Sequence, residues 1–212
     1  MAISTEVKTL KKLLDEIVEI LATRNSEYLF CVVGASGSGK TTQTEWLRDA
    51  IRKLFESRKI NADGLRCVES ITTRKPRYEG ETGHEFVSKE VFDSYEMVAY
   101  TMFDGNEYGV PAEMLDEREL YVIDIEGVKT LRERYHGKPL VVIYLDITPE
   151  EAARRMRERG DSEEKITKRL ANDAVMFADL EGLAADYVID ANRSQREVTI
   201  DLCTIILDTL NG

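Results

Sequence analysis

The chain has 212 residues, of which 42% are hydrophobic and 33% charged, and its formal net charge is −11 at pH 7. This length predicts one domain with an ordinary core, and the acidic balance excludes a broad nucleic-acid-binding face, which needs clustered basic residues. Because no apolar run approaches the roughly 20 residues of a membrane span and the N-terminus lacks the pattern of a signal peptide, we expect a cytoplasmic protein without membrane contact.

The first predicted element is an amphipathic helix over residues 3–23, where apolar residues recur at helical spacing. Its apolar stripe has to be covered, either by the same chain or by a second copy in a homodimer. The sequence therefore leaves two oligomeric states open, a monomer and a homodimer that pairs through this helix.

Downstream of residue 27, short apolar runs alternate with helical patterns. Strands are expected at about 28–33, 65–70, 120–125, 140–145 and 187–189, with short strands and a short helix between 87 and 110. Helices are expected from about 40 into the 50s, up to about 135, from 149, at 163–180 and at 195–210. This alternation predicts an α/β fold with a central parallel sheet and helices on both faces.

The segment GASGSGKT matches the phosphate-loop pattern between the first apolar strand and the helix that follows. Its glycines let backbone N–H groups converge on phosphate oxygens, and the start of the helix adds a partial positive charge. Lys40 can reach the β- and γ-phosphates of a nucleoside triphosphate, and the Thr41 hydroxyl can ligate Mg²⁺. The predicted ATP-binding residues of this loop are Gly34, Ala35, Ser36, Gly37, Ser38, Gly39, Lys40, Thr41 and Thr42.

A second anion site is indicated by Ser70, Arg74 and Arg77 in the segment SITTRKPR. Arginine binds phosphate oxygens through a bidentate fork, and Pro76 restricts the backbone between the two arginines. The segment follows a predicted strand, at the sheet edge where such folds bind ligands.

At this point the chain resembles the guanylate kinase family. The resemblance rests on GASGSGKTT, SITTRKPR, GETGHEFVS, FDGNEYG, VIDIEGV, RMRERGDSEEKITKRL and ADYVIDAN, which occur in the family's order between about 28 and 210. It implies a three-layer P-loop kinase domain at 28–212, with an acceptor-binding insert at about 71–110 and a short helical lid at about 154–170. Residues 1–27 form an extension. The implied activity is phosphorylation of a nucleoside monophosphate by ATP and Mg²⁺.

The same resemblance implies roles for individual residues. Ser70, Arg74, Arg77 and Tyr108 match the positions that hold the acceptor phosphate, and Glu81 and His84 match less closely within the same loop. Asp124 and Glu126 match an acidic pair, Arg155, Arg159 and Arg169 match arginines that act with Lys40 in catalysis, and Asp190 lies where the family has Asn near the adenine.

Two of these assignments have an ordinary structural alternative. Asp124 ends an apolar run, so it can lie near Mg²⁺ or can cap the helix that follows, while Glu126 would contact the acceptor nucleoside. Arg155 and Arg159 are four residues apart and share a helix face, where they can offset the charge of a transferring phosphoryl group. They can equally form salt bridges on a charged surface helix.

The pattern departs from the family at the two guanine-recognition positions, which hold Ala99 and Val110. Neither side chain can form the hydrogen bonds that select guanine. GMP or dGMP is the first prediction for the acceptor. The alternatives are another or modified nucleoside monophosphate, ribose 1,5-bisphosphate, or a non-catalytic protein-binding module, although such modules have eroded phosphate loops.

Overall fold

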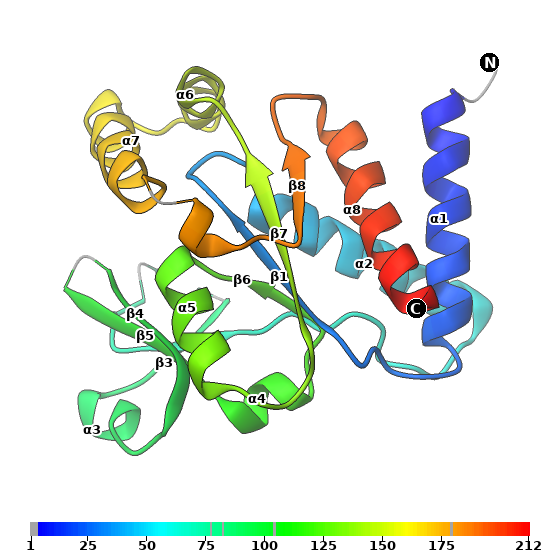
Figure 1. Cartoon of the computed structure of the whole chain (residues 1–212), viewed down its shortest axis with the longest axis horizontal. Coiled ribbons are helices and arrows are strands. Elements are labelled where there is room, and N and C mark those ends of the chain that lie inside the picture. The colour runs from blue at the N-terminus through cyan, green and yellow to red at the C-terminus, as the bar shows by residue number, and fades with distance from the viewer. Residues whose placement is uncertain (1–3, 77, 82, 104, 179) are drawn as a thin grey trace.

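The computed structural model describes the chain except residues 1–3, 77, 82, 104 and 179. Its central sheet has four parallel strands in the order β6-β1-β7-β8 (Figure 1). These strands are β1 (Leu29–Gly34), β6 (Leu120–Val122), β7 (Leu140–Asp146) and β8 (Tyr187–Asp190). The predicted α/β class with a parallel sheet is confirmed.

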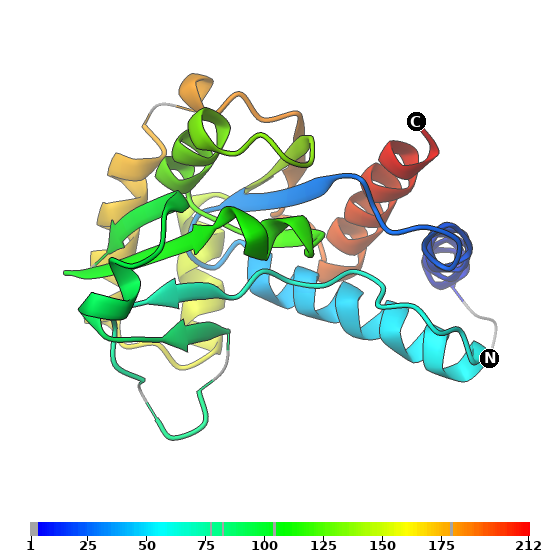
Figure 2. The same ribbon diagram turned by 90° about the horizontal axis from the view of Figure 1, so that it is seen from below.

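Helices cover both faces of the sheet, because successive side chains of a strand point to opposite sides. Phe30 and Val32 of β1 belong to one hydrophobic core, and Cys31 and Val33 belong to the other. Figure 2 shows β1 running between α2 on one side and α5 on the other. The first core includes residues of α1 (Thr5–Leu21), α2 (Lys40–Arg58) and α8 (Gln195–Asn211), and the second includes residues of α4 (Ala112–Asp116) and α5 (Ile125–Arg134).

A second, smaller sheet has the strand order β3-β2-β5-β4. Its strands are β2 (Ser70–Thr72), β3 (His84–Phe86), β4 (Met97–Phe103) and β5 (Asn106–Pro111), and the short helix α3 (Lys89–Phe92) joins β3 to β4. The prediction of a strand at 65–70 is wrong. Only Cys67 of that segment pairs with β6, as an isolated bridge, and the strand that begins at Ser70 belongs to this second sheet.

Two charged helices follow β7, namely α6 (Pro149–Glu158) and α7 (Glu163–Met176), and the 3-10 helix η1 (Glu181–Leu183) precedes β8. Pro149 occupies the first turn of α6, where its missing N–H costs nothing. The Thr148 hydroxyl caps this helix by accepting from the backbone N–H of Glu151. Helix α7 ends four residues earlier than the sequence predicts.

The N-terminal helix α1 packs against α8 and α2 of its own chain. Its buried face contains Leu14, Ile17, Val18 and Leu21, and all four belong to the first core. The same chain therefore covers the apolar stripe of α1. Among the described residues, no helix combines the length and the apolar character that crossing a membrane requires.

Candidate active site

The phosphate loop leaves the carboxyl end of β1 at Gly34, and α2 begins at Lys40. Gly39 precedes the helix with φ of 96°, and Gly37 has φ of 79°, in the left-handed region that favours glycine. A Cβ at Gly37 would lie 2.9 Å from the carbonyl oxygen of Ala152. The loop thus depends on glycine both for its backbone angles and for its close approach to α6.

Lys40 folds back over this loop. Its Nζ donates to the carbonyl oxygens of Gly34 (2.5 Å) and Ala35 (3.0 Å). Burial lowers the pKa of Lys40 from its ordinary value to about 8, and the negative charges of Asp173 and Asp124 oppose that shift. The two hydrogen bonds therefore hold the lysine in place, and its amino group loses its positive charge near pH 8.

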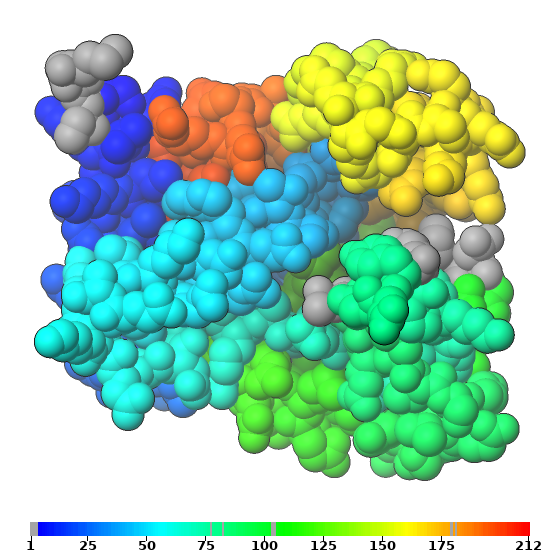
Figure 3. Space-filling view, turned by 180° about the vertical axis from the view of Figure 1, so that it is seen from behind, coloured from blue at the N-terminus to red at the C-terminus, as the bar shows by residue number. Residues whose placement is uncertain are grey.

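A donor cavity of about 690 Å³ opens above the loop, and residues 36–43 form one of its walls. The cavity is also lined by Arg155 of α6, by Arg159 directly after α6 and by Arg169 of α7, together with residues 192–195. Figure 3 shows the molecule hollowed between the yellow atoms of these helices and the green atoms of the second sheet. The predicted catalytic residues are thus brought to one cavity, together with Thr41 and Thr42.

The guanidinium groups of this cavity differ in how they are held. Arg155 donates to Glu151 (2.8 Å) and to the carbonyl oxygens of Ala191 (2.6 Å) and Arg193 (3.1 Å), so it ties α6 to the segment after β8. Arg159 is about half exposed and donates to Asp161 at 2.9 Å. Arg155 therefore forms the salt bridge of the alternative prediction, with Glu151, and also bonds two backbone carbonyl groups. Arg159 forms an ion pair with Asp161 in the adjacent loop.

Asp173 on α7 is a residue that the sequence reasoning missed. Its carboxylate accepts a hydrogen bond from the backbone N–H of Ser36 at 2.9 Å, inside the phosphate loop. Its spacing of four residues from Arg169 puts both on one helix face, and this spacing was the available signal. Arg154, which we did not predict, also borders the donor cavity and is paired with Glu151 and Glu158.

A second cavity of about 250 Å³ lies against the small sheet and the ends of β6 and α5. Ser70, His84 and Tyr108 line it, and the Ser70 hydroxyl is 2.8 Å from Nδ1 of His84. Arg74 donates to the Tyr108 hydroxyl (3.1 Å) and forms an ion pair with Glu81 (2.8 Å). Four of the predicted acceptor residues thus form one connected cluster around Tyr108, while Arg77 lies outside the described residues.

Asp124 borders this acceptor cavity and also caps α5, since its carboxylate accepts from the backbone N–H of Gly127 at 2.7 Å. Burial raises the pKa of its carboxyl, while hydrogen bonds from Gly127 and the Thr101 side chain lower it. A desolvated carboxylate whose charge also acts on Lys40 fits a nearby cation. Thr41 lines the donor cavity and Asp124 the acceptor cavity, and that these two would hold Mg²⁺, which would neutralise charge on the phosphate oxygens, stays a prediction.

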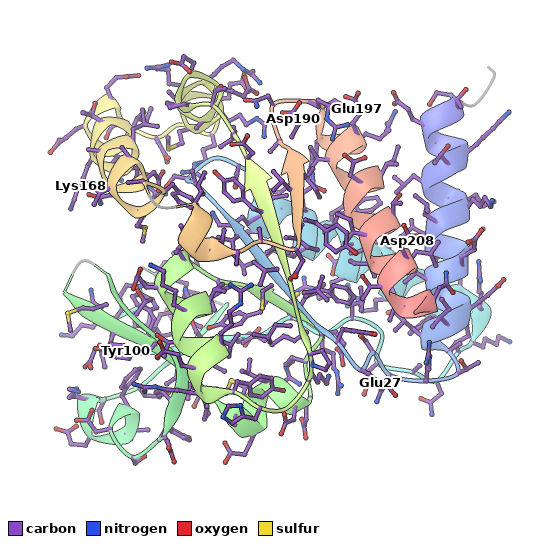
Figure 4. All side chains as sticks on the ribbon, in the orientation of Figure 1. Glu27, Tyr100, Lys168, Asp190, Glu197 and Asp208 are labelled. Atoms are coloured by element: carbon purple, nitrogen blue, oxygen red, sulfur yellow. The ribbon has the colours of Figure 1, made fainter. Side chains whose placement is uncertain are left out.

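Among the residues that the structure describes, Glu126 and Asp190 line neither cavity and bond to none of the predicted residues that do. Glu126 is exposed and pairs with Lys129 at 2.9 Å. Asp190 lies at the end of β8, near Glu197 (Figure 4), and its carboxylate accepts from the backbone and side chain of Asn192. Asn192 and Gln195 line the donor cavity instead, beside Ser194.

Three comparisons with known proteins show what this chain is similar to. A family model described as an AAA domain matches residues 31–176. A guanylate kinase of Prochlorococcus marinus is 30% identical over 161 residues, which covers 70% of this chain and 81% of that protein. A guanylate kinase of Geobacter metallireducens is 31% identical over 186 residues, with coverage of 80% and 83%.

Among solved structures, a shikimate kinase of Bacteroides thetaiotaomicron is similar over 85% of this chain and 98% of that chain, at 15% identity. Its TM-score is 0.39, so this likeness adds nothing to the comparison with the guanylate kinases.

Proposed function

This chain belongs to the guanylate kinase family and is a P-loop nucleoside monophosphate kinase, and from that premise we propose that it transfers the γ-phosphoryl group of ATP to GMP or dGMP. The observation that supports the proposal most directly is the position of Asp124. This residue borders the acceptor cavity, while its charge acts on Lys40 at the donor cavity. The proposal takes the two cavities as the sites of the two phosphates, which an in-line transfer needs close together.

In this proposal, the phosphate loop and Lys40 bind the triphosphate, and Thr41 and Asp124 hold the Mg²⁺ that accompanies ATP. The cluster around Tyr108, which includes Ser70 and Arg74, holds the acceptor phosphate. That phosphate is already anionic at pH 7, so the reaction needs no strong general base. Positioning and neutralisation of charge supply the catalysis.

The arginines at the donor cavity serve the transferring group. We propose that Arg159 and Arg169 offset the charge that spreads over the phosphoryl oxygens, with Arg155 beside them on the lid at about 154–170. Closing this lid would exclude water and so prevent hydrolysis of ATP. We propose that Asn192 and Gln195, which line the donor cavity, contact the donor nucleoside in place of Asp190.

A sugar phosphate acceptor is the second candidate. Ala99 and Val110 lie directly opposite each other on β4 and β5, and both are buried in the second core rather than facing the cavity. An acceptor without a base, such as ribose 1,5-bisphosphate, would not need hydrogen bonds at these positions.

An ADP-release assay with MgATP separates these candidates when GMP, dGMP, the other nucleoside monophosphates and ribose 1,5-bisphosphate are supplied in turn. We expect turnover with GMP and dGMP and its loss in Lys40→Met. Activity with the sugar phosphate alone would reject the nucleotide reading. A protein that consumes no ATP with any acceptor, and whose partner binding ignores Lys40→Met, would reject the kinase.

A further inference from the structure

The residues that line the acceptor cavity come from two regions of the chain. Ser70, His84 and Tyr108 belong to the second sheet, next to Arg74, whereas Tyr121, Ile123 and Gly127 belong to β6, to α5 and to the link between them. Tyr121 brings a phenol hydroxyl to this second group, so we considered how that hydroxyl can meet an acceptor.

Tyr121 lies on β6, where it pairs with Cys31 of β1, and its side chain is only 6% exposed. No hydrogen bond joins its hydroxyl to any residue that the structure describes. Burial raises the pKa of this phenol well above its ordinary value, so the hydroxyl stays protonated at neutral pH. The residue lines the acceptor cavity, so a bound acceptor can supply the hydrogen-bond partner that tyrosines in such positions normally have.

A further aromatic ring borders the same cavity. Tyr100 lines it and does not belong to the cluster assigned to the acceptor phosphate. Stacking on such a ring binds any nucleobase, because every base has a π face. Affinity from stacking therefore does not distinguish one base from another.

We propose that the Tyr121 hydroxyl is the group that reads the acceptor base, and that this kinase accepts nucleoside monophosphates with little preference for guanine. A phenol both donates and accepts one hydrogen bond, so it can pair with either a keto oxygen or an amino group. Selection for guanine needs partners for its imino and amino groups together. The polar side chains that line the cavity beside Tyr121 are Thr101 and Asp124, and these already bond each other and the backbone N–H of Gly127. The inference rests on the proposed transfer to a nucleoside monophosphate and concerns only which base the site takes.

A comparison of GMP with IMP tests the claim on the unaltered protein. The two differ only in the 2-amino group, so without a partner for that group their kcat/KM values should agree within about threefold. Across GMP, AMP, CMP, UMP and dTMP the spread should stay below about 100-fold, whereas a site that hydrogen-bonds a specific group reaches about 10⁴-fold. An IMP value more than 100-fold below that of GMP would overturn the inference.

Tyr121→Phe tests the hydroxyl itself. We expect the KM for the acceptor to rise about threefold to tenfold, by amounts that differ among the bases and so change their ranking, while the KM for ATP is unchanged. Tyr144→Phe is the matched control, because Tyr144 is equally buried in the same core and does not line the cavity. Acceptor KM values that are the same in Tyr121→Phe and in the control would contradict the role of Tyr121.

Failure of this inference can be told from failure of the proposed function. A wild-type protein that phosphorylates GMP and rejects IMP and the other bases retains the proposed function and refutes the relaxed base preference. A wild-type protein that phosphorylates none of these monophosphates refutes the proposed function, whatever Tyr121→Phe does. Thermal unfolding of the variants, followed by circular dichroism, shows that each comparison is made between folded proteins.

Discussion

The carboxylate of Asp173 on α7 accepts a hydrogen bond from the backbone N–H of Ser36 in the phosphate loop, at 2.9 Å and across 137 residues of sequence. Backbone N–H groups of this loop are the donors that bind phosphate oxygens. Asp173 also has the largest favourable charge interaction with the Lys40 ammonium. In this structure the carboxylate of an α7 residue thus occupies a donor of the phosphate loop, and we expect a triphosphate to compete with it.

The first prediction concerns Asp173→Asn. Removing the charge weakens the contact with Ser36 by about 1 kcal/mol and removes repulsion of the triphosphate, so MgATP should bind about fivefold more tightly. Isothermal titration without acceptor measures this affinity. Glu164→Gln, an equal change of charge at an exposed position of the same helix, should leave it unchanged. Weaker binding of MgATP to Asp173→Asn would mean that the carboxylate assists ATP rather than competing with it.

The second prediction concerns pH. Lys40 attracts the triphosphate only while its amino group is protonated, and the pKa of this group in the free protein is about 8. The protonated fraction falls as pH rises through that value, so the affinity for MgATP should fall by up to tenfold per pH unit above it and level off below it. Titrations between pH 6.5 and 9.5 measure this profile. In Lys40→Arg the guanidinium does not titrate in this range, so any remaining affinity should be independent of pH.

The third prediction separates the arginines of α6. Arg159→Ala should lower kcat about 100-fold with little change in either KM, because its charge serves the transition state. Arg157→Ala is the control, since Arg157 pairs with Glu163 and does not line the donor cavity. Arg155→Ala should in addition lower the melting temperature, because it breaks the contacts with Ala191 and Arg193. Equal kcat values for Arg159→Ala and the control would show that Arg159 is a surface residue only.

The fourth prediction concerns the acceptor phosphate. Arg74→Ala should raise the KM for the acceptor at least 100-fold, because a bidentate charged contact is lost, and leave the KM for ATP unchanged. Lys75→Ala removes a positive charge from the adjacent exposed position and should have little effect. Initial rates at saturating ATP measure both. An unchanged acceptor KM in Arg74→Ala would separate this arginine from the acceptor site.

The fifth prediction concerns stability away from the cavities. Glu119 is fully buried, and its carboxylate bonds Arg66 at 2.9 Å and Lys138 at 3.5 Å. Glu119→Ala leaves these two cations without their shared partner, so the free energy of unfolding should fall by about 3 kcal/mol. Denaturant unfolding measures the change. Glu117→Ala, at an exposed position two residues earlier, should cost less than about 0.5 kcal/mol.

Local chemistry made much of this protein predictable from its sequence. The phosphate loop could be read because the glycines and Lys40 act within a few residues of one another, so spacing alone determines the backbone that they form. Helix α6 could be read in the same way from Pro149 and the charged residues after it. The strand predicted at residues 65–70 was wrong because a short apolar run does not show which residues form a strand or which of the two sheets that strand joins.

Contacts between distant segments were decided only by the tertiary structure. Asp173 reaches the phosphate loop and Tyr121 the acceptor cavity because α7 and β6 pack where they do. No local pattern distinguishes Tyr121 from other aromatic residues. The packing of the whole chain likewise decided that α1 is covered by α8. The sequence by itself therefore determined that the chain binds and transfers phosphate, since that chemistry is local. Which side chains surround the acceptor depends on contacts between segments as far apart as Ser70 and Gly127, and folding alone brings these together.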